Sequence, residues 1–152
     1  MGKLKIYAHK MTEDAVIPEI QYNGTSAAFD LTCTETVEIP AKGCAVVKNG
    51  LNLLIDESEQ YYMTIHLRSS IGFKKLCIPH QGIVDAGYTG ELSVLVHNLG
   101  TQPVKIEKGD RYAQILVHKK PEFEIVEVDD IKFEELKSKQ QRADGGFGSS
   151  GK

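Results

Sequence analysis

Two short segments carry side chains that can bind phosphate and activate water. Arg68-Ser69-Ser70 follows an apolar run, and a guanidinium fork beside two hydroxyls can hold phosphate oxygens. Asp85 lies in a turn-forming stretch, where a carboxylate can take a proton from water as a general base. Each segment also has a structural interpretation, because such triplets often end a solvated strand and a turn aspartate often caps backbone amides. Alone, neither establishes the chemistry.

Further polar residues lie where strands are expected to begin or end. Asp110-Arg111 lies in a glycine turn, and Gln114 begins an apolar run. An acid beside a base in a turn is usually a structural ion pair or a cap, and Gln114 also fits a surface position. After residue 139, glycine and serine surround Arg142 and Phe147. That composition fits a frayed terminus or a flap that orders over a ligand.

The elements that must position these residues are mostly strands. Runs rich in β-forming residues cover 4–9, 32–39, 44–48, 51–55, 61–67, 92–98, 104–106, 112–118 and 123–128. Turn formers such as Ala41-Lys42-Gly43 and Lys48-Asn49-Gly50 recur between them. The pattern predicts an all-β sandwich or barrel of short antiparallel strands. The segment 129–139 is the only helical candidate, with a docked extended arm as its alternative.

Composition limits the class of protein. A chain of 152 residues with 41% hydrophobic content favours one domain, 1–139, followed by an arm, 140–152. The net charge of -3 argues against a nucleic-acid-binding protein, and no apolar stretch approaches the ~18 residues of a membrane helix. Three widely spaced cysteines suggest neither disulfides nor a zinc site. We expect a cytoplasmic protein, or a nuclear or host-cell one if its source is eukaryotic or viral.

Taken in order, five segments resemble the five conserved motifs of the dUTP pyrophosphatase family. They are 27–31, 68–72, 82–91, 109–114 and the tail after residue 139, so the resemblance spans 27–151. It implies a jelly-roll-like β fold and a homotrimer whose active sites each use segments of all three subunits, with the arm closing over one of them. It also implies magnesium-assisted hydrolysis of dUTP to dUMP and pyrophosphate, which keeps uracil out of DNA and supplies dUMP for dTMP synthesis.

The resemblance also assigns roles to single residues. Asp85 would activate the water that attacks the α-phosphorus, and Asp30 would reach Mg²⁺ through water. Tyr88 would lie beneath the deoxyribose and reject a 2′-hydroxyl. The phosphate chain would be held by Arg68, Ser69, Ser70 and Gln114. The main chain of Gly82, Ile83, Val84 and Ser93 would contact uracil. The arm would contribute Arg142, Phe147, Gly148 and Ser149.

Some positions depart from the family pattern or favour other functions. Ala28 and Ala143 replace common glycines, and Pro79 and His80 stand where some members contact the base with a side chain. A dCTP deaminase of the same fold is the nearest rival enzyme, but it needs a glutamate where this chain has Leu95. A trimeric binding or regulatory scaffold is the rival from another class. The scattered histidines are not assigned to a metal.

Overall fold

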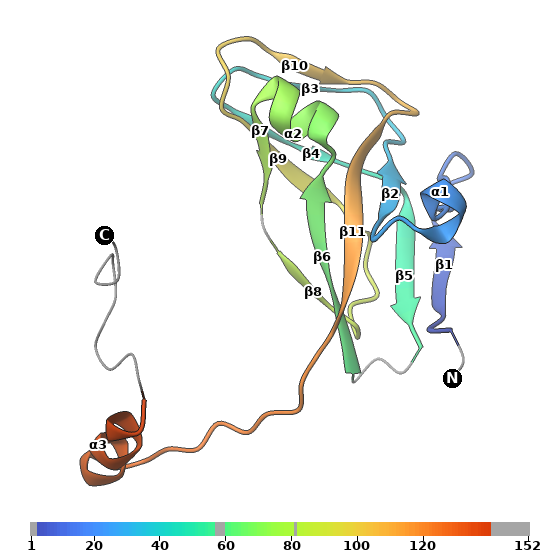
Figure 1. Cartoon of the computed structure of the whole chain (residues 1–152). Helices are drawn as coiled ribbons and strands as arrows, with labels where there is room; N and C mark the ends of the chain where they lie inside the picture. The colour runs from blue at the N-terminus through green and yellow to red at the C-terminus, as the bar shows by residue number, and fades with distance from the viewer. Residues whose placement is uncertain (1–2, 57–59, 81, 141–152) are drawn as a thin grey trace. The chain divides into compact units, whose positions relative to one another are not determined.

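The computed structural model describes residues 3–56, 60–80 and 82–140, which form short strands and three helices (Figure 1). The strands are β1 (Ile6–Lys10), β2 (Phe29–Thr32), β3 (Val37–Ile39), β4 (Cys44–Val47), β5 (Leu51–Ile55), β6 (Tyr61–Leu67), β7 (Cys77–Pro79), β8 (Ile83–Asp85), β9 (Val94–Asn98), β10 (Val104–Ile106) and β11 (Arg111–Lys119). The helices are α1 (Gln21–Gly24), α2 (Ser69–Lys75) and α3 (Asp130–Ser138). The expectation of an all-β, jelly-roll-like fold is confirmed.

All strand pairs are antiparallel. The largest sheet has the order β2-β11-β6-β8, and a second sheet has the order β4-β9-β7. Two further pairs, β1-β5 and β10-β3, complete the arrangement. Strands distant in sequence therefore lie side by side, and this brings the polar segments of the sequence into two groups.

The largest sheet buries one face and leaves the other polar. Its buried side chains include Leu31, Met63, Ile65, Ala113 and Ile115, which belong to the hydrophobic core. Because side chains alternate along a strand, the residues between them project from the opposite face. That polar face carries Asp30, Tyr62, His66, Asp85 and Gln114.

Two of the strands expected from sequence were wrong. The run 32–39 is not one strand, because β2 ends at Thr32 and β3 begins at Val37, while between them Cys33 N–H donates to Asp110 O at 2.9 Å. The run 123–128 is not a strand, and Phe123 and Ile125 are 73% and 90% exposed. Its apolar residues have the composition of a strand, but composition alone does not supply a pairing partner. The helix expected at 129–139 is confirmed as α3, with the Asp129 side chain capping Lys132 N–H at 2.8 Å.

The chain divides into two compact units, Met1–Pro121 and Glu122–Lys152. Of the described elements, the first unit holds all the strands and the second holds α3. Only Gln140 of the expected arm, 140–152, is described, so the boundary at residue 139 stays a prediction. No helix in the described ranges has the length and apolar character needed to cross a membrane. Cys33, Cys44 and Cys77 are all free, and burial raises the pKa of the Cys33 and Cys77 thiols.

A buried tyrosine on β11 gives a test of this core. Tyr112 is fully buried; its hydroxyl donates to Val47 O at 3.0 Å and accepts from Asn49 Nδ2 at 3.4 Å. Burial raises the pKa of this phenol, so it remains a donor. We expect Tyr112→Phe to lower the free energy of unfolding by about 1–2 kcal/mol, because a buried carbonyl loses its donor. Urea unfolding at fixed protein concentration measures this loss. Tyr22→Phe, at an 81% exposed position, is the control and should change it by less than about 0.5 kcal/mol.

Candidate active site

The first group of polar residues gathers around Asp30, and we call it the arginine cluster. It consists of Asp30, Arg68, Arg111 and Gln114. Asp30 Oδ2 lies 3.3 Å from Arg68 Nε and 3.1 Å from Arg111 Nη1, and the Asp30 side chain is 13% exposed. Gln114 lies opposite Asp30 across the β2-β11 pair, and its Nε2 donates to Leu67 O at 3.5 Å. Two guanidinium groups around one carboxylate leave a net positive charge, which favours a phosphate.

Backbone hydrogen bonds position the cluster at the end of β6. Arg68 N–H donates to Tyr112 O at 3.0 Å, and Arg68 Nη1 donates to Arg111 O at 3.4 Å. The chain then enters α2, with Ile71 N–H donating to Arg68 O at 2.9 Å. Ser69 and Ser70 form the first residues of that helix. The sheet pairing and the helix start thus place Arg68 and both serines at the corner of the fold where β6 ends.

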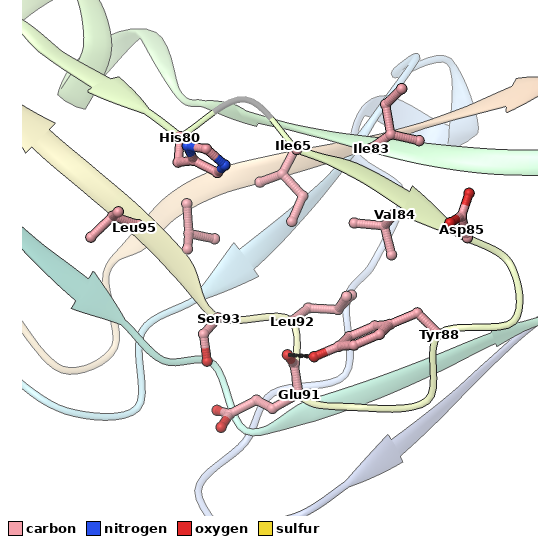
Figure 2. Close-up of a pocket in the computed structure, with 12 residues that line it drawn as sticks. Ile65, His80, Ile83, Val84, Asp85, Tyr88, Glu91, Leu92, Ser93 and Leu95 are labelled. Atoms are coloured by element: carbon pink, nitrogen blue, oxygen red, sulfur yellow. Dashed lines mark hydrogen bonds between the residues drawn. The ribbon is translucent and has the colours of Figure 1, made fainter.

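The second group lines a pocket of about 290 Å³ beside β8 and β9 (Figure 2). We call it the hairpin pocket. It is lined by Ile65, His80, Gly82, Ile83, Val84, Asp85, Tyr88, Glu91, Leu92, Ser93, Val94 and Leu95. Figure 2 shows Val84 pointing toward Leu92, whereas Asp85 lies on the other side of β8. The pocket therefore has an apolar floor with a carboxylate at its rim, a combination suited to a flat, weakly polar ring near a reacting group.

Hydrogen bonds shape the wall of this pocket. Tyr88 Oη donates to Glu91 O at 3.1 Å, so the ring folds back over its own loop. His80 N–H donates to Leu95 O at 2.7 Å, which holds the chain before β8 against β9. Roles were assigned from the sequence to six residues in the third motif or on the strand expected after it. All six line this pocket: Gly82, Ile83, Val84, Asp85, Tyr88 and Ser93.

Asp85 and the arginine cluster lie toward opposite ends of β6 on the polar face of the largest sheet. Asp85 pairs with Tyr62 near the start of β6, and Arg68 follows its end. At roughly 3.3 Å per residue, Tyr62 and Arg68 are about 20 Å apart. A base, its water, a phosphorus atom and a guanidinium on the same phosphate span only about 10 Å, since each contact is about 3 Å. The Arg68 side chain does not close this separation, because its guanidinium contacts Asp30 on β2, three strands from Asp85 on β8 in the order β2-β11-β6-β8. Within one chain, Asp85 and Arg68 are therefore not placed to contact the same phosphate.

The order and spacing of these residues match a known family. A family model described as dUTPase matches residues 13–151 of the chain. The chain belongs to the dUTPase family. It is 39% identical over 154 residues to the deoxyuridine 5'-triphosphate nucleotidohydrolase of Wolinella succinogenes, with 100% of this chain and 97% of that protein covered. The protein of the same name from Arabidopsis thaliana is 33% identical over 142 residues, which cover 93% of this chain and 80% of that one.

Solved structures of dUTPases share the fold. A mutant dUTPase of Staphylococcus bacteriophage 80alpha, solved with dUpNHpp, superposes with a TM-score of 0.80 and 25% identity, covering 97% of this chain and 99% of that one. A mutant dUTPase from phage phi11 of S. aureus, whose structure shows a structural Mg(II) ion, gives a TM-score of 0.71 and 23% identity. That comparison covers 83% of this chain and 99% of the phage chain.

The residues present fit a magnesium ion that the substrate holds, as expected for the dUTPase family. No group of three or more metal-binding side chains occurs among residues 3–56, 60–80 and 82–140. Mg²⁺ commonly takes most of its ligands from water and phosphates, with one or two carboxylates. Both arginine contacts of Asp30 use Oδ2, so Oδ1 is available for a magnesium-bound water. This chemistry agrees with the indirect role expected for Asp30.

Sequence reasoning missed some residues that the structure places at these dUTPase sites. Arg111 was expected in an ion pair or as a cap, but its partner, the Asp30 carboxylate that Arg68 also contacts, was not identified. Glu91 and Leu92 line the hairpin pocket, and only their position at the end of the third motif hinted at this. The expected arm residues Arg142, Phe147, Gly148 and Ser149 lie outside the described residues, so their roles stay predictions.

Proposed function

We propose that this chain hydrolyses dUTP to dUMP and pyrophosphate with Mg²⁺. The observation that carries the proposal is the presence of both halves of a nucleotide site. The hairpin pocket offers a floor for a base and a carboxylate at its rim, and the arginine cluster offers cationic donors for phosphates. Membership of the dUTPase family supports this substrate. The product would supply dUMP for dTMP synthesis, and its formation would keep uracil out of DNA.

We further propose that the two halves belong to different subunits of a homotrimer. The separation of about 20 Å between the ends of β6 supports this, because a second copy can bring its arginine cluster to the hairpin pocket of the first. The arm of a third copy would close the site with Arg142, Phe147, Gly148 and Ser149. Arm closure would exclude bulk water while the phosphates are held.

In the proposed reaction, the Asp85 carboxylate accepts a proton from water as the water oxygen attacks the α-phosphorus in line. The bond from the α-phosphorus to its bridging oxygen breaks, and pyrophosphate leaves. Arg68, Ser69, Ser70 and Gln114 bind the phosphate oxygens and stabilise the charge that moves toward the leaving group. When bound, Mg²⁺ neutralises charge on the three phosphates, with Asp30 contacting it through water.

Recognition of the nucleoside is assigned to the hairpin pocket. The main chain of Gly82, Ile83, Val84 and Ser93 would donate to and accept from uracil. Tyr88 would lie against the deoxyribose and exclude a 2′-hydroxyl. Leu95 lines the pocket where a deaminase needs a glutamate, and its side chain transfers no proton. These residues favour hydrolysis of dUTP over deamination of dCTP. We propose a cytoplasmic location for the enzyme.

A substrate panel tests the proposed function. The purified full chain is mixed in turn with dUTP, dCTP, dTTP and UTP in the presence of Mg²⁺, and the nucleoside product, pyrophosphate and ammonia are measured. We expect dUMP and pyrophosphate from dUTP, with far slower turnover of the other three. Ammonia release from dCTP would assign the chain to deamination instead. An absence of turnover with all four nucleotides would favour a binding scaffold.

A further inference from the structure

The Tyr88 side chain lies in an unusual place for an exposed aromatic residue. The loop after β8 turns so that the ring folds back toward Glu91, and its hydroxyl donates to Glu91 O at 3.1 Å (Figure 2). The ring is 48% exposed, so one side faces the pocket while the other covers its own loop. Something in that loop must leave space for the covered side.

That space is provided by Gly90. A Cβ atom at Gly90 would meet Tyr88 Oη and Cζ inside van der Waals contact, and it would lie 3.1 Å from Tyr88 Cε2. Carbon atoms prefer separations of about 3.5–4.0 Å. Gly90 is not among the residues with positive φ, so the requirement here is for space and not for a special backbone conformation. By contrast, a Cβ at Gly87 in the same loop would have no heavy atom within 4 Å.

The loop around Gly90 is held on both sides by hydrogen bonds to Gly50 and the start of β5. Asn52 Nδ2 donates to Thr89 O at 2.8 Å, and Gly50 N–H donates to Glu91 Oε1 at 2.9 Å. Leu92 N–H donates to Leu51 O at 3.2 Å. Moving the backbone away from an added methyl would strain these hydrogen bonds. Moving the ring would break only the hydrogen bond from Tyr88 Oη to Glu91 O. We therefore expect an added methyl at residue 90 to displace the Tyr88 ring and not the backbone.

We propose that Gly90 is a positioning residue that sets the selectivity for the sugar through Tyr88. The absence of a side chain at residue 90 lets the ring lie where it leaves no room for a 2′-hydroxyl, and the contacts from β5 keep the loop from adapting. The inference rests on the proposed function, because it requires that Tyr88 contacts the sugar of the nucleotide. It adds a residue that itself makes no contact with substrate.

The test compares Gly90→Ala with Gly87→Ala in the full chain. For each, kcat/KM is measured with dUTP and with UTP, and melting temperature is recorded. We expect Gly90→Ala to lower the ratio of dUTP to UTP kcat/KM by about tenfold, since steric discrimination depends on exact ring placement. We expect Gly87→Ala to keep this ratio within about twofold, with both variants melting near the wild type. A Gly90→Ala ratio equal to or above that of Gly87→Ala would overturn the inference.

A double-mutant cycle separates an effect through Tyr88 from a general loosening of the pocket. In a Tyr88→Ala background, adding Gly90→Ala is expected to leave the already reduced ratio unchanged. A further fall in that background would contradict action through the ring. If the wild type turns over dUTP and the cycle fails, only this inference is lost. If the wild type does not turn over dUTP, the proposed function is wrong, and so is the inference that rests on it.

Discussion

Asp85→Asn is expected to lower kcat for dUTP by about 10²- to 10⁴-fold, the usual contribution of a positioned general base. The amide keeps the size of the carboxylate and can still hydrogen-bond water, but it accepts no proton at neutral pH. Asp85 ends β8 at an exposed position on the rim of the hairpin pocket. The substitution should therefore leave melting temperature unchanged, and KM for dUTP should stay within about threefold because binding groups are retained.

Steady-state release of pyrophosphate measures this loss, and Asp56→Asn is the matched control. Asp56 is an exposed turn residue after β5 that does not line the hairpin pocket. Its variant should keep wild-type kcat. A variant at residue 85 that retains more than about a tenth of the wild-type kcat would move the water-activating role to another group.

Strands were predictable where the sequence alternates locally. The run 61–67 coincides with β6, because its apolar residues Met63, Ile65 and Leu67 alternate with polar ones and face the core. The break between β2 and β3 was not predictable in this way. The two strands pair with different partners that are far away in sequence, β2 with β11 and β3 with β10. The alternation of apolar and polar residues shows which face of a strand is buried. It does not show which distant strand pairs with it.

The sequence named candidate residues for the site, but it did not show where these residues lie relative to one another in the fold. Motif order named Asp30, Arg68, Asp85 and Gln114, yet Arg111 joins them only because β11 pairs with β2 and brings it to the Asp30 carboxylate. The separation between Asp85 and Arg68 likewise follows from the β6-β8 register. Such long-range pairings are set by the whole core, so no local pattern contains them. They are also the basis for proposing that a second subunit completes the site.

The proposed sharing of the site between subunits can be tested by mixing inactive variants. Asp85→Asn damages the hairpin pocket, and Arg68→Ala damages the arginine cluster while Arg111 continues to pair with Asp30. Each variant alone should be nearly inactive. If a site combines the pocket of one subunit with the cluster of another, trimers mixed in equal amounts should recover about a quarter of wild-type activity, because each half is intact in about half of the cases. Co-refolding from urea followed by the dUTP assay measures the recovery.

A second mixture provides the control. Asp85→Asn and Tyr88→Ala both damage the hairpin pocket, so every pocket in their mixed trimers carries a defect. Activity after mixing should stay at the average of the two variants. Recovery in the first mixture but not in the second would require that Arg68 and Asp85 of one site come from different chains. Recovery in neither mixture would mean that a single chain builds the site, and β6 would then have to bend or β8 shift its register before Asp85 and Arg68 could hold the same phosphate.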